Sequence, residues 1–447
     1  MRLHTDLAAA KQRNFRIPDG KWVTAILVMV ALALPVSYTL LHSLKTSPID
    51  EWVYIDYTDR VFQQGRALEG DVASRYTTDI MACYGVLPGG TFGTCGLGET
   101  AALPYGGHPT GSPYMPIYFW ITASVGGVIR LATGIEPLIA WRLTGALWLA
   151  AAMLVYVRLS RLWRVPDAAT LALGGLLIAS PYVWTAHSFI STDAPSLLIG
   201  ASLLMLATQI RRGKLHAAWL ILAAPLAVAL KITNLVAVGL AVMYLLIAWA
   251  SDAVRSRRAG DPAKLRPLIG RIAIVTAGIA AAGLMQVLWL RFVNSTAATS
   301  YRADQGVATP LGKGELINQA LNFLPGAITS NPFITASYYA QAASGLSWFL
   351  ITAVLGSFLR LNKWGARGEM VTSVAIASVL AAPALAILLH AVTGSYFQLP
   401  SRYGASLIPA FLLMGGFLIR NRVALWLLGA YALALGAIAV ALSVYLH

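Results

Sequence analysis

Two adjacent carboxylates, Asp50 and Glu51, come shortly after the first apolar run of the chain. That run, 22–44, is long enough to cross the hydrocarbon of a bilayer, so the pair lies where hydrocarbon gives way to water. Carboxylates at such a boundary are costly to hold in place, which makes a functional role the first hypothesis to test. A carboxylate here is suited to act as a general base that takes a proton from an attacking hydroxyl group.

Three charged residues farther along the chain also stand beside apolar runs. Asp193 precedes one run, Lys231 ends another, and Arg402 lies with Tyr403 in a short polar turn. Each of these residues has an ordinary explanation. Asp193 is explained as a helix N-cap, Lys231 as a cation that extends to lipid headgroups, and Arg402 as a marker of the membrane interface. Together with the carboxylates, however, the two cations suit a phosphate leaving group, because Arg and Lys both bind phosphate oxygens.

The segment 45–138 carries a histidine and both cysteines of the chain. For an isolated residue such as His108, a structural role is more common than a functional one. Exposed free thiols are uncommon outside the cytoplasm, so Cys83 and Cys95 are predicted to form a disulfide. Closing so short a loop contributes about 3 kcal/mol, mainly by restricting the unfolded chain. The remaining acidic residues of interest are interpreted as a solvated helix face: Asp56, Asp59, Glu69 and Asp71.

The composition is that of a membrane protein. Of the 447 residues, 57% are hydrophobic and 11% are charged, and the mean hydropathy is +0.67. Soluble domains contain about 25% charged residues. The net charge of +15 does not indicate nucleic-acid binding, because two thirds of the Lys and Arg residues fall in short segments between apolar runs. Placing those segments in the cytoplasm satisfies the positive-inside rule. They are 2–21, 158–164, 211–214, 255–271, 360–367 and 420–422.

The pattern predicts a single all-α polytopic domain over residues 1–447, with residues 1–21 in the cytoplasm and the C-terminus outside. Two long outer segments, 45–138 and 292–342, separate groups of spans. Within them, Tyr114–Ile129 and Leu316–Ile334 are predicted to lie in the membrane interface, the first with Tyr114, Tyr118, Phe119 and Trp120 at headgroup level. The eleven expected spans, each close to the length that a bilayer requires, are 22–44, 139–157, 168–187, 193–210, 216–231, 233–250, 270–291, 343–359, 370–391, 404–419 and 423–445.

Several short stretches resemble the GT-C superfamily of membrane glycosyltransferases, which includes lipid A aminoarabinose transferases and protein mannosyltransferases. The run Asp50-Glu51-Trp52-Val53-Tyr54, followed by Gln-Gly at 64–65, is similar to the first outer loop of that superfamily. The run 108–120 resembles its Pro-Pro-Leu-Tyr-Tyr-Trp stretch, and Trp-Arg-Leu at 141–143 resembles an Ala-Arg-Leu that opens its second span. The likeness keeps its order over roughly the first 210 residues and is topological afterwards.

This resemblance implies an inverting transfer of a sugar from a polyprenyl-phosphate donor to a hydroxyl acceptor, a glycolipid or a cell-envelope glycan, at the outer face of the inner (plasma) membrane. It implies that Asp50 is the base, with Glu51 beside it in the catalytic pair. The donor phosphate would be bound by Lys231, Arg402 and Tyr403. Substrate would be contacted by Asp193, His108 and Tyr54.

The sequence departs from the superfamily at one corner of this site. The Lys-Pro-Pro of the superfamily is replaced by His108-Pro109, with Thr-Gly-Ser inserted at 110–112. Recognition of the acceptor at this corner therefore differs from the superfamily pattern, and a divalent metal ion stays open as a cofactor.

Two other functions fit a polytopic protein with charges at one face. A transporter or flippase of a lipid-linked sugar would use the cations to hold the headgroup during transport. Such a protein is expected to carry charged residues midway along its spans and often an internal repeat, and the sequence shows almost none of the first and no sign of the second. A ligase or polymerase of lipid-linked glycans is the third possibility, although those enzymes usually carry their larger loop late in the chain.

Overall fold

The computed structural model describes residues 20–41, 44–48, 50–87, 89–258, 266–301, 308–330, 338–361 and 365–445. Over these ranges the chain is helical, and its only β-type pairings are two isolated bridges, Thr46–Val86 and Thr309–Tyr396. The α-helices are α1 (Gly20–Leu41), α2 (Glu51–Gln64), α3 (Arg75–Cys83), α4 (Ile117–Thr133), α5 (Pro137–Leu162), α6 (Asp167–Ile178), α7 (Pro181–Ser188), α8 (Ser196–Arg211), α9 (Trp219–Leu230), α10 (Leu235–Arg258), α11 (Arg266–Ser295), α12 (Lys313–Gly326), α13 (Tyr338–Leu361), α14 (Ala366–Thr393), α15 (Ile408–Leu418) and α16 (Arg422–Tyr445).

Seven of the described helices are long and apolar enough to cross a bilayer: α1, α5, α10 with the short turn before it, α11, α13, α14 and α16. The bent pair α6 and α7 makes an eighth if it is counted as one span. The prediction of a polytopic helical membrane protein is confirmed, and each of these elements coincides with an expected span. The expected count of eleven is not reached. At the remaining three places the helices α8, α9 and α15 have only 16, 12 and 11 residues.

The expected span 168–187 is broken where α6 gives way to α7, with a bend of 63° between the two helices. Pro181 begins α7, and Ser180 before it is extended, with φ −78° and ψ 152°. This break follows from the proline ring, which disfavours the helical conformation in the preceding residue. The side chain of Ser180 then caps α7 by accepting a hydrogen bond from the backbone N–H of Val183.

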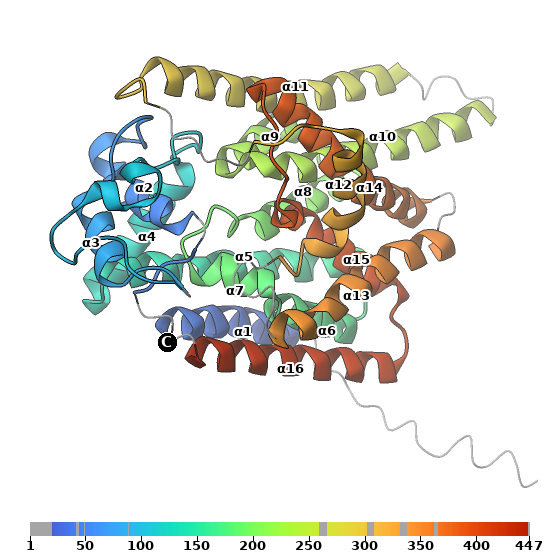
Figure 1. Cartoon of the computed structure of the whole chain (residues 1–447). Helices are drawn as coiled ribbons and strands as arrows, with labels where there is room; N and C mark the ends of the chain where they lie inside the picture. The colour runs from blue at the N-terminus through green and yellow to red at the C-terminus, as the bar shows by residue number, and fades with distance from the viewer. Residues whose placement is uncertain are drawn as a thin grey trace, which may run out of the picture.

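Residues between α1 and α5 fold into a separate layer, here called the cap, which covers one end of the helix bundle (Figure 1). The cap contains α2, α3 and α4 and has its own apolar core. Ile190, Ala194 and Leu230 of the bundle belong to the same core, so the cap is packed onto the bundle rather than tethered to it.

Tyr118 and Phe119, which were expected at headgroup level, are enclosed by protein. Both are buried in the core of the cap, where the ring of Phe119 stacks on Tyr57 at a centroid distance of 3.8 Å. The hydroxyl of Tyr118 accepts a hydrogen bond from the backbone N–H of Ser191. Of the aromatic side chains of α4, Trp120 is the exposed one. The run 114–129 reads as amphipathic, and its apolar face is covered by protein instead of by lipid.

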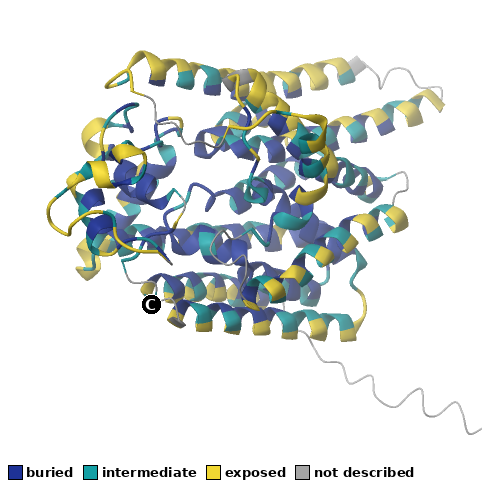
Figure 2. Cartoon of the chain, in the orientation of Figure 1, coloured by how far each residue is buried: buried dark blue, intermediate teal, exposed yellow. Residues whose placement is uncertain are grey.

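Burial separates the bundle into an inner and an outer set of helices (Figure 2). In α10, 67% of the residues in the apolar stretch are buried, and in α5, 56% are. The corresponding values for α11 and α16 are 22% and 28%, and both lie at the periphery of the bundle. The outer helices therefore expose apolar side chains of the kind that face lipid.

The basic segments gather at the end of the bundle opposite the cap, here called the basic end. Arg211, at the end of α8, contacts Asp252 of α10 at 2.7 Å and Glu369 of α14 at 3.0 Å. Arg161, at the end of α5, donates to Thr24 at the start of α1. Where the structure describes the basic segments, it therefore places them at one end of the bundle, as the sequence predicts. Parts of the expected basic segments lie outside the described residues, namely 1–19, 259–265 and 362–364.

Candidate functional site

Asp50 lies between the bundle and the cap and has an uncommon backbone conformation. It immediately precedes α2, with φ 53° and ψ −18°, in the left-handed region. Its side chain forms no cap on α2; instead, its Oδ2 lies 3.3 Å from Nη2 of Arg402. A residue without a glycine's freedom costs free energy in this conformation, and such residues are concentrated at functional sites.

Four side chains, Asp50, Asp193, Lys231 and Arg402, form what we call the charged cluster. Arg402 bridges the two carboxylates, because its Nε lies 3.3 Å from Oδ2 of Asp193 while its Nη2 reaches Asp50. Lys231 donates to Oδ1 of Asp193 at 2.5 Å. The structure thus brings together four residues that are separated by up to 352 positions in the sequence.

The three short helices end at this cluster. Asp193 lies in the turn that leads into α8, and Lys231 follows α9 in an extended conformation, with φ −165°. Arg402 lies in a short 3₁₀ helix, Ser401–Leu407 (η5), that leads into α15. Non-helical backbone at membrane depth is tolerated where it is buried in protein or lines a polar cavity. The ends of these helices thus supply three of the four members of the charged cluster.

The cluster opens into a pocket between α7, the turn before α8 and the start of the cap. The pocket holds about 440 Å³ of empty space, including solvent at its mouth. Asp50 keeps 39% of its side chain exposed, whereas Asp193 and Lys231 keep 6% and 2%. Asp50 is therefore the carboxylate of the cluster that a ligand can reach. The lining residues are Ser47, Asp50, Tyr54, Tyr182, Thr185, Ala186, Phe189, Ile190, Ser191, Asp193, Ser330 and Arg402.

Tyrosine side chains surround the cluster. The hydroxyl of Tyr54 forms a hydrogen bond with that of Tyr114 at 3.2 Å and accepts one from Thr192. The ring of Tyr403 faces both cations, with Nζ of Lys231 at 5.1 Å and the guanidinium carbon of Arg402 at 5.6 Å from its centroid. Such cation–π contacts hold the two cations in place without neutralising them.

Electrostatics at Asp50 reflect two opposed causes. Burial raises the pKa of the Asp50 carboxyl above its ordinary value, and the charges of Arg402 and Lys231 lower it in part. The balance is an increase, so this carboxylate accepts a proton more readily than one in water. For Tyr403, burial raises the pKa of the hydroxyl to about 12. It stays neutral in the physiological range.

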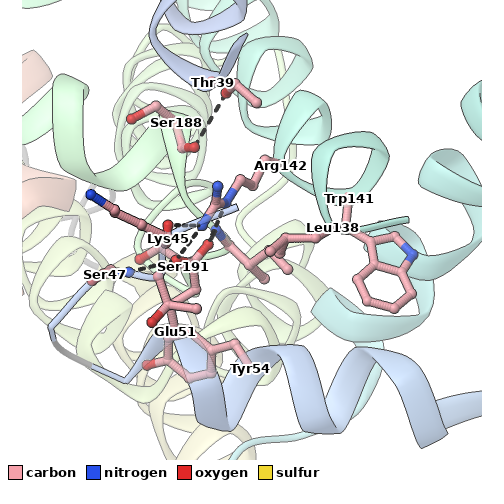
Figure 3. A network of polar contacts seen from close by, with 12 residues as sticks. Thr39, Lys45, Ser47, Glu51, Tyr54, Leu138, Trp141, Arg142, Ser188 and Ser191 are labelled. Carbon is pink, nitrogen blue, oxygen red and sulfur yellow. Dashed lines mark hydrogen bonds and ion pairs between the residues drawn. The ribbon is translucent and has the colours of Figure 1, made fainter. Parts of the chain in front are cut away.

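Glu51, the neighbour of Asp50, is placed differently (Figure 3). It is 1% exposed, and its carboxylate pairs with Arg142 of α5 through Nε at 2.8 Å and Nη2 at 2.9 Å. The backbone N–H groups of Ser47 and Ile190 donate to the same carboxylate. Glu51 thus links the cap, α5 and the turn before α8, and this geometry favours a structural role over the catalytic one expected for it.

His108 lies in the cap and contacts residues outside the charged cluster. Its Nδ1 is 3.0 Å from the carbonyl oxygen of Asp71, and its ring packs against Tyr301 at 4.1 Å. These contacts do not include a member of the charged cluster. The structure thus gives the expected substrate contact of His108 no geometric support.

Asp56 is not part of a solvated face, contrary to the expectation. It is 1% exposed, and Arg60 and the backbone N–H of Ser74 bind its carboxylate at 2.5 Å and 2.6 Å. It therefore fixes α2 to the segment that leads into α3.

The predicted disulfide between Cys83 and Cys95 is present and closes a loop of the cap. Within the described ranges, no group of three or more His, Cys, Asp or Glu side chains is placed to hold a metal ion. The loop that the disulfide closes does not contribute to the lining of the pocket.

Three contributors to the site were not singled out from the sequence as site residues: Arg142, Tyr114 and Tyr182. Tyr182 donates to the backbone oxygen of Asp193 at 2.7 Å. For Arg142 a signal was present, since a cation near the start of an apolar run requires a partner. Nothing in the pattern of the two tyrosines distinguishes them from interfacial aromatic residues.

Comparison with known proteins adds no family to this picture. No family model, no curated protein and no solved structure matches the chain.

Proposed function

We propose that this chain is a glycosyltransferase that moves a sugar from a polyprenyl-phosphate donor to a hydroxyl acceptor. The observation that carries the proposal is the position of Asp50. It is a partly exposed carboxylate in a pocket, in contact with Arg402 and backed by the ion pair of Asp193 and Lys231. A base beside cations is the arrangement that hydroxyl attack with departure of a phosphate requires.

The reaction is a single displacement. Asp50 accepts the proton of the acceptor hydroxyl while the hydroxyl oxygen forms a bond to the anomeric carbon of the donor sugar. The bond from that carbon to the phosphate oxygen breaks, and its electron pair stays on the polyprenyl phosphate. One displacement inverts the anomeric configuration. No general acid is needed, because a phosphate ester is a good leaving group.

Arg402, which lines the pocket, stabilises the charge that develops on the leaving phosphate, and Lys231 adds its positive charge from its buried pair with Asp193. Arginine carries five N–H donors in a planar fork, and its contacts with Asp50 and Asp193 use only part of them. It can therefore bind a phosphate oxygen without releasing Asp50. Asp193 orients both cations, and Tyr403 holds them by cation–π contact.

The proposal includes an orientation in the inner (plasma) membrane. The basic end faces the cytoplasm, as the positive-inside rule requires, and the cap with the pocket faces outward. The donor then enters from the outer leaflet, and the acceptor is a glycolipid or an envelope glycan.

The experiment is a transfer assay with purified protein in lipid nanodiscs, where no gradient exists. Labelled polyprenyl-phosphate sugars are screened singly against membrane-derived acceptors, with and without a metal chelator. We expect transfer from at least one donor, and loss of about 100- to 10,000-fold in Asp50→Asn. Near-normal transfer by Asp50→Asn would rule out Asp50 as the general base. Absence of transfer, with movement of a lipid-linked sugar across the bilayer of proteoliposomes, would favour the flippase instead.

A further inference from the structure

An exposed tyrosine of the cap, Tyr105, lies near Asp50 without taking part in the charged cluster. It is 37% exposed, and partial burial, together with the negative charge of Asp50, raises the pKa of its hydroxyl. Its ring packs on that of Trp52 with a centroid distance of 6.3 Å and an angle of 33° between the planes. Trp52 is 5% exposed and stands two positions after Asp50 in α2.

The backbone holds Tyr105 in this position at a cost. Tyr105 has φ 56° and ψ 31°, in the left-handed region, and Gly106 after it has φ 63°. Among the described residues, the non-glycine residues with positive φ are Asp50, Tyr105 and Arg164, so Tyr105 shares this uncommon conformation with Asp50. Residues are kept in such conformations where the surrounding structure fixes them, and they are enriched at ligand sites.

The turn around Tyr105 is anchored on both sides. The backbone N–H of Ala73 donates to the carbonyl oxygen of Gly107 at 2.8 Å, and that of Leu103 donates to Thr100 at 3.0 Å. A Cβ atom on Gly107 would overlap the backbone of Thr100. The exposed ring is therefore presented by a fixed turn.

We propose that Tyr105, supported by Trp52, is a stacking platform for a sugar ring of the acceptor. This inference rests on the proposed function and deepens it, because it assigns a place and a contact to the sugar ring of the acceptor. The C–H face of a pyranose ring packs on an aromatic face, and its hydroxyl groups stay free to point toward Asp50. The contact with the buried indole of Trp52 restricts the movement of the tyrosine ring. Tyr105 would thus position the acceptor without reacting.

The test measures binding of methyl β-D-glucopyranoside and methyl β-D-galactopyranoside to the protein in nanodiscs by saturation-transfer NMR, with glycerol as the ring-free comparison. We expect wild-type protein to bind at least one pyranoside in preference to glycerol. Tyr105→Ala should weaken that binding by up to about tenfold. Tyr105→Phe should keep it, because the ring and not the hydroxyl carries the contact. Tyr84→Ala, which removes an exposed tyrosine elsewhere in the cap, is the matched control and should bind as wild type.

Three outcomes would overturn the inference: no pyranoside binding by wild-type protein, unchanged binding by Tyr105→Ala, or equal loss in Tyr105→Phe and Tyr105→Ala. Transfer activity is measured on the same preparations. Pyranoside binding that depends on Tyr105, without transfer from any donor, would refute the proposed function and leave the saccharide site standing. Transfer by wild-type protein, with unchanged pyranoside binding in Tyr105→Ala, would refute the platform alone.

Discussion

Asp50 and Glu51 are neighbours in the chain, yet their carboxylates lie in different environments. Glu51 is enclosed by Arg142 and two backbone N–H groups, whereas Asp50 faces the pocket and touches Arg402. The left-handed conformation of Asp50 produces this divergence, because it turns one side chain out of the helix start while α2 carries the other inward. The two acidic residues thus have separate tasks.

The first prediction concerns the buried pair. Glu51→Ala deprives the buried guanidinium of Arg142 of its carboxylate partner, so we expect the free energy of unfolding to fall by about 3–5 kcal/mol. Unfolding is followed by denaturant titration of the purified protein. The double variant Glu51→Leu/Arg142→Met removes both charges and should recover part of the loss. A Glu51→Ala protein as stable as wild type would show that the pair is not structural.

Replacement of Asp50, unlike replacement of Glu51, should not lower the stability of the protein. Its pKa is raised in the folded protein, so its ionised form opposes folding once the pH exceeds the ordinary carboxyl range. At pH 7, Asp50→Asn is therefore expected to melt at the same temperature as wild type or higher, although transfer is lost. Thermal unfolding and transfer are measured on one preparation. A marked fall in Tm would indicate that Asp50 is a structural residue.

The same shift predicts the pH dependence of transfer. Only ionised Asp50 can accept a proton, so the rate should fall as the pH is lowered through its raised pKa. That fall lies above the value of about 4 expected for an ordinary Asp. Because the charge of Arg402 lowers the pKa of Asp50, Arg402→Gln should move the fall to still higher pH. Movement to lower pH would contradict the assigned electrostatics.

Arg402 should not be replaceable by lysine. Its Nε and Nη2 reach two carboxylates at once, and a single ammonium group cannot reproduce that fork. Loss of one charged hydrogen bond corresponds to about 10- to 100-fold in kcat/KM for the donor. We expect Arg402→Lys to show such a loss with the fold intact. The double variant with Asp50→Asn should lose little more than Asp50→Asn alone, since both residues serve one step.

Much of the fold was predictable because apolar runs and basic segments obey simple rules. Eight of the eleven expected spans coincide with a long described helix or with the bent pair α6 and α7, the other three fall on shorter helices, and the basic segments that are described share one end. The misjudged elements are informative. The apolar runs next to Asp193, Lys231 and Arg402 are long enough to suggest whole spans. Hydropathy does not show where a helix begins or stops inside a bundle.

At the site, residue types were readable and partners were not. Carboxylates and cations at the ends of apolar runs pointed to Asp50 and Arg402, and both are in the cluster. The pairing of Glu51 with Arg142 joins residues 91 positions apart, a separation on which local pattern gives no information. Likewise, an exposed and a buried aromatic ring look alike in sequence, as Tyr118 shows.

The last prediction tests how the bundle holds Arg402. Gly200 of α8 packs directly on η5, and a Cβ atom there would overlap the backbone oxygen of Ser406. Gly200→Ala must therefore push η5 away from α8, and Arg402 is carried by η5. We expect reduced transfer and a lower Tm. Gly239→Ala is the matched control, because Gly239 lies within α10 with no atom near the added methyl group. That variant should gain up to about 1 kcal/mol of stability from helix propensity and keep full transfer. Equal behaviour of the two variants would show that the contact between α8 and η5 does not position the site.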